Sequence, residues 1–218
     1  RLTLAGICIF ISQCSLFEKN IKVKPGDFDY FSISKNYFQP PVNRPFPLTV
    51  QKGNNLYSSI TADGKYMYFT SDKKGNQDIY LRDLNSSVVV QITSHPASEF
   101  KPAVSPDGKK LVFVSTRFDP NGDLVLLDVN PEKTVKDSLK GIYQQEQFEN
   151  FLTSREGEDR FTDTDPVFTP DGKSIVFVSD RFTPGLPNLV LLTLGRKEMV
   201  PLTKDGAASP RFSDDGRY

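Results

Sequence analysis

The stretch SPDGKKLVFVSTR at residues 105–117 returns 64 residues later as TPDGKSIVFVSDR at residues 169–181. Nine of the thirteen positions are identical, including Pro-Asp-Gly-Lys and Val-Phe-Val-Ser. Pro-Asp-Gly is a tight-turn sequence, because proline fixes φ, aspartate bonds back to the backbone and glycine accepts a positive φ. The chain therefore repeats one structural unit, a tight turn followed by an apolar strand.

Four Asp-Gly pairs that stand in the same turn position give the length of the repeat, since they are separated by 44, 64 and 44 residues. We interpret these pairs as structural repeat turns: Asp63-Gly64, Asp107-Gly108, Asp171-Gly172 and Asp215-Gly216. The longer middle spacing predicts an insertion of 20 residues at about 131–150, with a short helix. A period near 44 residues with strand-like content is typical of one propeller blade.

The second unit shows the expected strands most clearly. Residues 102–105, 110–115 and 123–129 are predicted strands, and an outer strand is expected after the insertion, around 151–154. Apolar residues fill consecutive positions of the two central strands, which indicates burial on both faces. A parallel sheet would also give such strands, but the gaps between them are too short for crossover helices. We therefore expect small antiparallel sheets stacked face to face around a common axis.

These units resemble the propeller repeats of the TolB type, which are WD40-like. The hallmark is Pro, a hydrophobic residue, Ser-Pro-Asp-Gly-Lys, an apolar strand, Ser-x-Arg, a second apolar strand and Leu-Thr. It is carried by Pro102–Arg117 and Pro166–Arg181, more loosely by TADGKYMYFTSDK at 61–73, and by the final SPRFSDDGRY at 209–218. The resemblance covers residues 47–218 and implies an all-β fold.

The resemblance implies a partial β-propeller with about three four-stranded antiparallel blades and the start of a fourth. Closed propellers have about 4 to 8 blades, so we expect a fragment of a longer protein with an open ring and exposed edge strands. PLTV at 47–50 is expected to be an outermost strand.

The amino-terminal residues 1–14 are predicted to be an export signal. Their apolar run, from Leu2 to Ile11, is shorter than the roughly 20 residues of a membrane-spanning helix and has the length of a signal-peptide core. ISQC at 11–14 resembles a bacterial lipobox, which implies lipidation of Cys14, although Gln13 departs from the usual small residue. An ordinary secretory signal or a short anchor is the alternative. Residues 15–46 are rich in proline and aromatic residues and are predicted to be an extended tether.

Charge and cysteine content exclude several classes of function. The chain has 27 basic and 27 acidic residues, so it offers no basic field for nucleic acid or for an anionic membrane surface. Membrane attachment is therefore expected through the lipid anchor alone. Both cysteines, Cys8 and Cys14, precede the repeats, so a disulfide framework or a thiolate metal site is not expected there.

No catalytic constellation, cofactor site or metal site is predicted. The chain lacks a G-x-S-x-G motif, and its one histidine, His95, is expected to be a solvent-exposed loop residue. The repeated serines at 71, 115 and 179 are expected to form strand-ending hydrogen bonds rather than to act as nucleophiles. Carboxylates in EGEDRFTDTD at 156–165 could bind calcium, but a solvated acidic loop is the preferred interpretation. Lys73, Arg117 and Arg181 could form a basic ring, but local ion pairs with aspartate are preferred.

The leading hypothesis is a non-enzymatic binding or scaffold propeller of a bacterial cell-envelope lipoprotein, placed in the periplasm or at the outer membrane. Its partner would be an envelope protein or a glycan; TolB, which the repeats resemble, acts through protein contacts. The alternative is the N-terminal gating propeller of a prolyl-oligopeptidase-like serine peptidase, whose catalytic domain would lie beyond Tyr218. A peptidoglycan-binding domain beyond that point would instead make the protein a wall tether.

Overall fold

The computed structural model describes residues 48–49, 52–86, 88–145, 150–153 and 160–213. The chain divides into two units, residues 1–47 and 48–218, and all described residues belong to the second. The predicted signal segment, Cys14, the tether, Asp215 and Gly216 lie outside the described residues.

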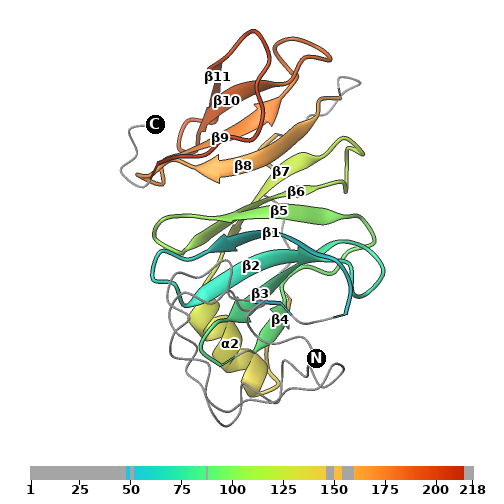
Figure 1. The fold of residues 1–218 in the computed structure, drawn as a ribbon, viewed down its shortest axis with the longest axis vertical. Helices are drawn as coiled ribbons and strands as arrows, with labels where there is room; N and C mark the ends of the chain where they lie inside the picture. Colours follow the sequence, from blue (N-terminus) through green and yellow to red (C-terminus); the bar gives the residue numbers. More distant parts are fainter. Residues whose placement is uncertain (1–47, 50–51, 87, 146–149, 154–159, 214–218) are drawn as a thin grey trace, which may run out of the picture. The chain divides into compact units, whose positions relative to one another are not determined.

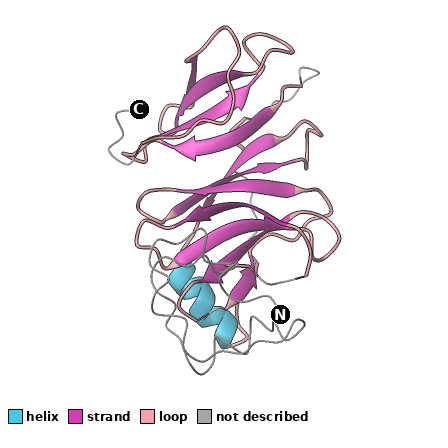
Figure 2. Cartoon of the chain, in the orientation of Figure 1, coloured by secondary structure: helices cyan, strands magenta, loops and turns pink. Residues whose placement is uncertain are grey.

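Three antiparallel sheets form the second unit, and each follows the chain strand by strand (Figures 1 and 2). The first sheet consists of β1 (Asn55–Ile60), β2 (Tyr66–Ser71), β3 (Asp78–Asp83) and β4 (Val89–Gln91). The second consists of β5 (Glu99–Val104), β6 (Lys110–Ser115) and β7 (Asp123–Asp128), and the third of β8 (Asp163–Phe168), β9 (Ser174–Ser179), β10 (Asn188–Thr193) and β11 (Glu198–Pro201). The expected all-β, partial-propeller architecture is confirmed, and each sheet is one blade.

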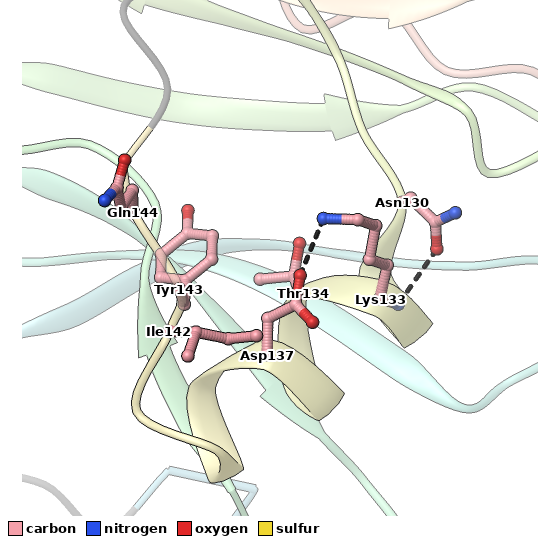
Figure 3. A pocket seen from close by; sticks show the side chains of 7 residues that line it. All are labelled: Asn130, Lys133, Thr134, Asp137, Ile142, Tyr143 and Gln144. Atoms are coloured by element: carbon pink, nitrogen blue, oxygen red, sulfur yellow. Dashed lines mark hydrogen bonds and ion pairs between the residues drawn. The ribbon is translucent and has the colours of Figure 1, made fainter.

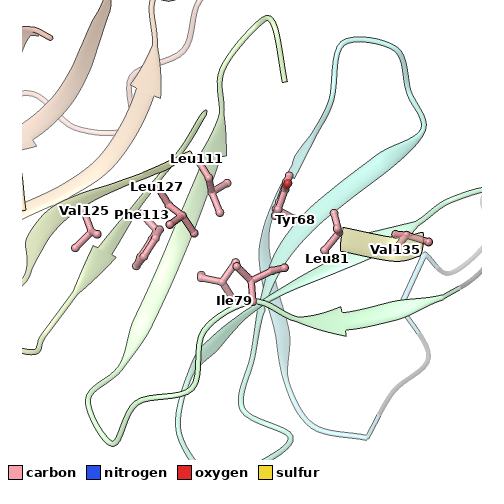
Figure 4. Packing of buried hydrophobic residues seen from close by; sticks show 9 residues of the cluster. Tyr68, Ile79, Leu81, Leu111, Phe113, Val125, Leu127 and Val135 are labelled. Atoms are coloured by element: carbon pink, nitrogen blue, oxygen red, sulfur yellow. The ribbon is translucent and has the colours of Figure 1, made fainter. Parts of the chain in front are cut away.

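The sheets pack face to face through side chains that alternate along the central strands. In the second sheet Leu111 and Phe113 belong to a cluster shared with the first sheet, whereas Val112 and Val114 belong to a cluster shared with the third. Figure 4 shows the first of these clusters. All four side chains are fully buried, and each contributes roughly 1.5–3 kcal/mol of hydrophobic free energy. The consecutive apolar pattern therefore means a sheet covered on both sides, as predicted.

The second sheet has three strands rather than the expected four. Its outer strand is reduced to a single bridge between Val125 and Phe151. Hydrogen bonds from Leu126 N to Asn150 O (3.0 Å) and from Leu152 N to Leu124 O (2.7 Å) flank this bridge. Among the described residues, the insertion leads the chain away from β7 and brings it back to this sheet at residues 150–152.

The insertion contains the predicted short helix, α2 (Pro131–Leu139). Asn130 caps its first turn, since its side chain accepts a hydrogen bond from Lys133 N, and Pro131 occupies a position where no N–H is needed. Val135 is buried in the cluster between the first two sheets, and the helix contacts β4. One face of α2 therefore packs against the core between these two sheets.

Two expected strands are not formed by the described residues. Leu48 and Thr49 lie outside any strand, and Leu48 packs instead against the side chains of Met67, Phe69 and Tyr80 on the first sheet. The segment from Ser209 to Ser213, expected to begin a fourth blade, has no strand pairing in the described part of the chain. Among the described residues, no helix has the length and apolar character needed to cross a membrane.

Candidate functional site

The first strands of the three sheets, β1, β5 and β8, share an irregularity that the other strands lack. We call them the inner strands; neighbouring ones contact each other across the stack. Each has a register shift in its pairing with the next strand: between Leu56 and Ser59, between Phe100 and Ala103, and between Thr164 and Val167. Such bulges bend a strand and redirect a side chain.

One residue in each bulge has left-handed backbone geometry. The φ angles are 50° at Tyr57, 54° at Lys101 and 51° at Asp165, and Ser209 at the next equivalent position has 56°. For non-glycine residues this geometry costs of the order of 1–3 kcal/mol each. A hydrogen bond to the first sheet holds the second bulge, since Lys101 N donates to Thr70 Oγ1 on β2 (3.2 Å). Strain that recurs at equivalent positions indicates that the placement of these side chains matters.

The redirected side chains form a row across the three sheets, which we call the bulge row: Tyr57, Lys101 and Asp165. Lys101 Nζ lies 2.8 Å from Asp165 Oδ1 and donates a hydrogen bond of 2.9 Å to Thr164 Oγ1. The same ammonium group lies 5.4 Å from the centroid of the Tyr57 ring. The row thus joins an aromatic ring, a cation and an anion, a set suited to binding rather than to nucleophilic chemistry.

The exposed part of the bulge row lies at its aromatic end. The side chains of Lys101 and Asp165 are 20% and 24% exposed, whereas Tyr57 is 49% exposed. Leu56 and Ile60, on the same strand as Tyr57, are 45% and 46% exposed. Strand β1 therefore offers an apolar and aromatic surface beside a partly enclosed ion pair, which is the composition of a protein-binding surface.

Buried acidic residues form a second repeated arrangement, at the two junctions between sheets. Two carboxyl groups, one threonine and one arginine occupy equivalent positions at each junction. The first junction cluster is Asp78, Thr93, Glu99 and Arg117, and the second is Asp123, Thr153, Asp163 and Arg181. The four carboxylate residues are between 0% and 5% exposed.

Hydrogen bonds satisfy only part of each cluster. In the first, Gln91 Nε2 donates to Asp78 Oδ2 (2.9 Å) and Ser115 Oγ donates a long bond to Glu99 Oε1 (3.4 Å). In the second, Arg181 forms an ion pair with Asp163, and Thr153 Oγ1 donates to Asp123 Oδ1 (3.4 Å).

The pKa values of the junction carboxyl groups shift upward because these groups lie away from water. Burial, followed by the nearby charge of Asp78, raises the pKa of Glu99 to about 7. Burial, followed by the charge of Asp163, raises the pKa of Asp123 to about 6. The pKa values of Asp78 and Asp163 are also raised by burial.

The repeat-turn residues lie at the ends of the sheets opposite to the junction clusters. One recurring hydrogen-bond pattern holds them. At the second turn Asp107 Oδ1 accepts bonds from Ser105 Oγ (2.6 Å) and from Lys109 N (3.1 Å). Gly108 has a φ of 71° and donates its N–H to Ser105 O. Asp63 and Asp171 accept the equivalent bonds in the first and third units.

The repeated serines end the second strand of each sheet and are fully buried. Ser115 and Ser179 accept hydrogen bonds from the backbone N–H groups of Arg117 (3.3 Å) and Arg181 (3.2 Å), which are strand-ending bonds of the expected kind. The expectation was wrong for Ser71, whose hydroxyl has no hydrogen-bond partner among the described residues. The local ion pair predicted for Arg181 is confirmed. Lys73 instead places its Nζ 3.9 Å from the centroid of the Tyr80 ring.

His95 is half-buried, so the expectation of a solvent-exposed histidine was wrong. Its Nδ1 accepts a hydrogen bond from Ala97 N (3.0 Å), and Asn76 Nδ2 donates to its carbonyl oxygen (2.6 Å). These bonds fold the loop before β5 against the end of the first sheet. Burial, with a smaller effect from Arg117, lowers the pKa of His95.

The acidic segment does not form one solvated loop. Asp163 and Asp165 are part of β8, where the first enters a junction cluster and the second the bulge row. Glu156, Glu158 and Asp159 lie outside the described residues. Within the described ranges, no group of three or more His, Cys, Asp or Glu residues is arranged to hold a metal ion.

A hollow of about 240 Å³ lies within the insertion (Figure 3). It is lined by Asn130, Lys133, Thr134, Asp137, Ile142, Tyr143 and Gln144. The ammonium group of Lys133 is paired with Asp137 at 2.6 Å. The hollow is therefore a local feature of the insertion, and its charged groups already have partners.

Comparison with known proteins agrees with the resemblance to TolB-type repeats. No family model matches the chain. The Tol-Pal system protein TolB of Helicobacter pylori (strain ATCC 700392 / 26695) is 30% identical over 172 residues, which cover 76% of this chain and 36% of that protein. The chain thus spans little more than a third of the length of this curated relative.

Two solved structures show the same fold. TolB from Acinetobacter baumannii superposes with a TM-score of 0.61 and 26% identity, covering 80% of this chain and 39% of that one. A protein described as a possible TolB from Agrobacterium tumefaciens superposes with a TM-score of 0.56 and 21% identity, covering 76% and 57%.

Proposed function

We propose, from the premise that this chain is a TolB-like β-propeller, that it is a non-enzymatic binding propeller whose partner is a protein of the bacterial cell envelope. The observation that carries the proposal is the bulge row. Three strained backbone positions on three strands bring Tyr57, Lys101 and Asp165 side by side. A fold that only needed stability would relieve such strain with glycine.

The partner is a protein segment that packs an apolar side chain against β1 and places a polar group near the ion pair. The half-exposed Leu56, Tyr57 and Ile60 give that segment apolar contact area. Tyrosine is a frequent anchor at interfaces because it buries a large rigid surface and keeps a polar tip. The likeness to a protein of the Tol-Pal system supports an envelope protein as the partner, with a glycan as the competing ligand.

We propose the same envelope location for the whole chain. Residues 1–14 serve as the export signal, Cys14 carries the lipid, and residues 15–46 tether the propeller of residues 47–218. The apolar run and the ISQC sequence support this division. Metabolic labelling with a radioactive fatty acid tests lipidation: label should enter the wild-type protein and not Cys14→Ser. No label in the wild type, or equal labelling of the two proteins, would refute lipidation of Cys14.

Photocrosslinking in bacterial cells tests the binding surface. A photoreactive amino acid replaces Tyr57 in one variant and Leu139 in another, and both variants are expressed as the full chain. Leu139 is the matched control, because it is 68% exposed but lies on α2, away from the bulge row. We expect one discrete protein adduct from position 57 that is missing from position 139.

The adduct must also depend on the surface itself. Exchanging Leu56 for serine should reduce the yield from position 57, whereas Leu139→Ser should leave it unchanged. The same adducts from both positions, or an adduct with a glycan in place of a protein, would refute the proposed surface or partner class respectively. Measured hydrolysis of peptide substrates by the purified chain would refute the non-enzymatic assignment.

A further inference from the structure

We propose that each junction between neighbouring sheets retains one proton on its paired carboxyl groups, so that the two junction clusters stabilise the contact between sheets at mildly acidic pH and weaken as the pH rises toward neutrality. This inference concerns the contact between blades and is independent of the binding partner. It rests on burial, on the number of available hydrogen-bond donors, and on the charge balance of each cluster.

The first step is the shortage of donors in the first junction cluster. The hydroxyl of Thr93 lies within hydrogen-bonding reach of both Asp78 and Glu99, yet it has one proton and already accepts a bond from Ile79 N (2.9 Å). Asp78 Oδ1 and Glu99 Oε2 have no hydrogen-bond partner among the described residues. A proton on one carboxyl group supplies the missing donor.

The second junction cluster repeats this shortage with different residues. Thr153 accepts a bond from Leu124 N (2.9 Å) and its hydroxyl is shared between Asp123 and Asp163. Asp123 Oδ2 and Asp163 Oδ1 again have no partner in the described part of the chain. Because both junctions lack hydrogen-bond donors in the same way, the shortage belongs to the repeat and is not a local irregularity.

Charge balance gives the same number of protons. Each cluster sets two carboxyl groups against one guanidinium group, Arg117 in the first and Arg181 in the second. Leaving both carboxyl groups ionised would bury one uncompensated negative charge, which is costly in a site that water does not reach. One retained proton makes each cluster neutral. The raised pKa values of Glu99, about 7, and of Asp123, about 6, agree with a proton held by each carboxyl pair.

The third sheet shows what the position requires when no second acid is present. Asn188 there takes the place of Asp78 and Asp123, and Ala207 follows at the position of Glu99 and Asp163. Thr203 Oγ1 and Gly206 N both donate to Asn188 Oδ1, at 3.1 Å each. An amide resembles a protonated carboxyl group in shape and charge, so the chain itself contains the neutral form of the site.

Other titratable groups lie near the clusters and affect how their carboxyl groups titrate. Lys74 approaches the first cluster from the loop that follows β2, the backbone N–H of His95 approaches Asp78 from the loop that precedes β5, and the Tyr80 hydroxyl lies near Asp78 on β3. Asp119 approaches the second cluster from the loop that follows β6. His95 opposes this effect, because its lowered pKa makes the folded state more stable as the pH rises.

The experiment is a carboxyl ¹³C NMR titration of the full chain labelled in aspartate and glutamate, from acid to mildly alkaline pH. One glutamate signal, assigned by its loss in Glu99→Gln, should titrate about two pH units or more above an ordinary glutamate. One aspartate signal, assigned by its loss in Asp123→Asn, should also titrate well above the aspartates of the repeat turns, whose pKa values are lowered. Ordinary midpoints for both groups would overturn the proposal, and this readout on the wild-type chain does not depend on whether a variant folds.

A second readout connects the proton to the junction. Between the pKa of an ordinary glutamate and that of Glu99, the folded state holds a proton that the unfolded state has lost. Each retained proton should therefore raise the unfolding equilibrium constant of the wild type by up to about tenfold per pH unit, between the ordinary pKa of its group and the raised value. The double variant Glu99→Gln/Asp123→Asn should lose this dependence, whereas the control Asp128→Asn, on a residue whose side chain is 84% exposed, should keep it. An unchanged slope in the double variant would refute the proposal. So would stabilisation by added calcium that Asp123→Asn removes, because a cation would then occupy the site.

Discussion

Lys101 on β5 and Asp165 on β8 form an ion pair of 2.8 Å that crosses from the second sheet to the third, and both residues have left-handed backbone geometry. The pair is thus made by two bulges that each cost conformational energy. Its side chains are about four-fifths buried, so solvent screens the attraction less than at an ordinary surface pair.

We expect the ion pair to contribute about 1 kcal/mol of coupling energy, at the upper end of the range for exposed pairs. A double-mutant cycle with Lys101→Met, Asp165→Asn and the double variant, followed by urea unfolding, measures this value. The exposed pair of Lys110 and Asp128, 2.6 Å apart, is the matched control and should show a smaller coupling. Equal couplings would mean that the bulges add nothing to the pair.

The left-handed backbone of Tyr57 predicts that glycine at this position gives a more stable protein than alanine, which reverses the usual order in a strand. In an ordinary strand glycine is less stable than alanine, because glycine loses more backbone entropy on folding. At a φ of 50° the order should reverse, and Tyr57→Gly should be more stable than Tyr57→Ala by about 1 kcal/mol. Ile60, on the same strand and similarly exposed, is the control, and there alanine should be the more stable. Thermal or urea unfolding of the four variants decides the question.

Much of the fold could be predicted from the sequence because the recurring tight-turn residues mark each repeat. The strand predicted at 110–115 is β6, with the same ends. The outer strand of the second sheet could not be predicted equally well, since its pairing depends on how the insertion packs. Val135 enters the core between two sheets, and this contact cannot be read from the local pattern of α2.

The bulge row escaped prediction for a physical reason. Its members are chemically unlike one another, so they form no motif, and Lys101 and Asp165 each precede a proline. A residue before proline normally favours extended geometry, so the local rule points away from the left-handed conformation that the structure has. The junction clusters did leave a signal: an acidic residue opens both β3 and β7, and another opens both β5 and β8, in strands whose other residues are largely apolar.

The packing between sheets predicts that alanine substitution at two leucines has very different effects on the free energy of unfolding. Leu111 is fully buried between the first and second sheets, so Leu111→Ala should lower the free energy of unfolding by about 2–5 kcal/mol. Leu139 is 68% exposed on α2, and Leu139→Ala should change it by less than about 0.5 kcal/mol. Urea unfolding monitored by circular dichroism measures both. A cost at Leu111 as small as that at Leu139 would contradict face-to-face stacking of the two sheets.

The turn aspartates predict an acid-sensitive limb of stability with a sign opposite to that of the junction clusters. Hydrogen bonds from Ser105 and from the backbone of Lys109 lower the pKa of Asp107, and equivalent bonds lower the pKa values of Asp63 and Asp171. A carboxyl group whose folded pKa is depressed stabilises the fold above its unfolded pKa, and this contribution is lost as the pH falls through the folded value. Stability should therefore decrease below about pH 4, the ordinary value for aspartate.

Replacing all three turn aspartates with asparagine should flatten this acid limb and leave the decline toward neutral pH unchanged, because that decline belongs to Glu99 and Asp123. The matched control replaces Asp128, which is exposed and lies outside the turns, and should leave both limbs in place. Urea midpoints measured across the pH range separate the two limbs. If the triple variant also removed the decline toward neutrality, the turns and the junctions would be coupled, and the assignment of each limb to its own set of carboxyl groups would be wrong.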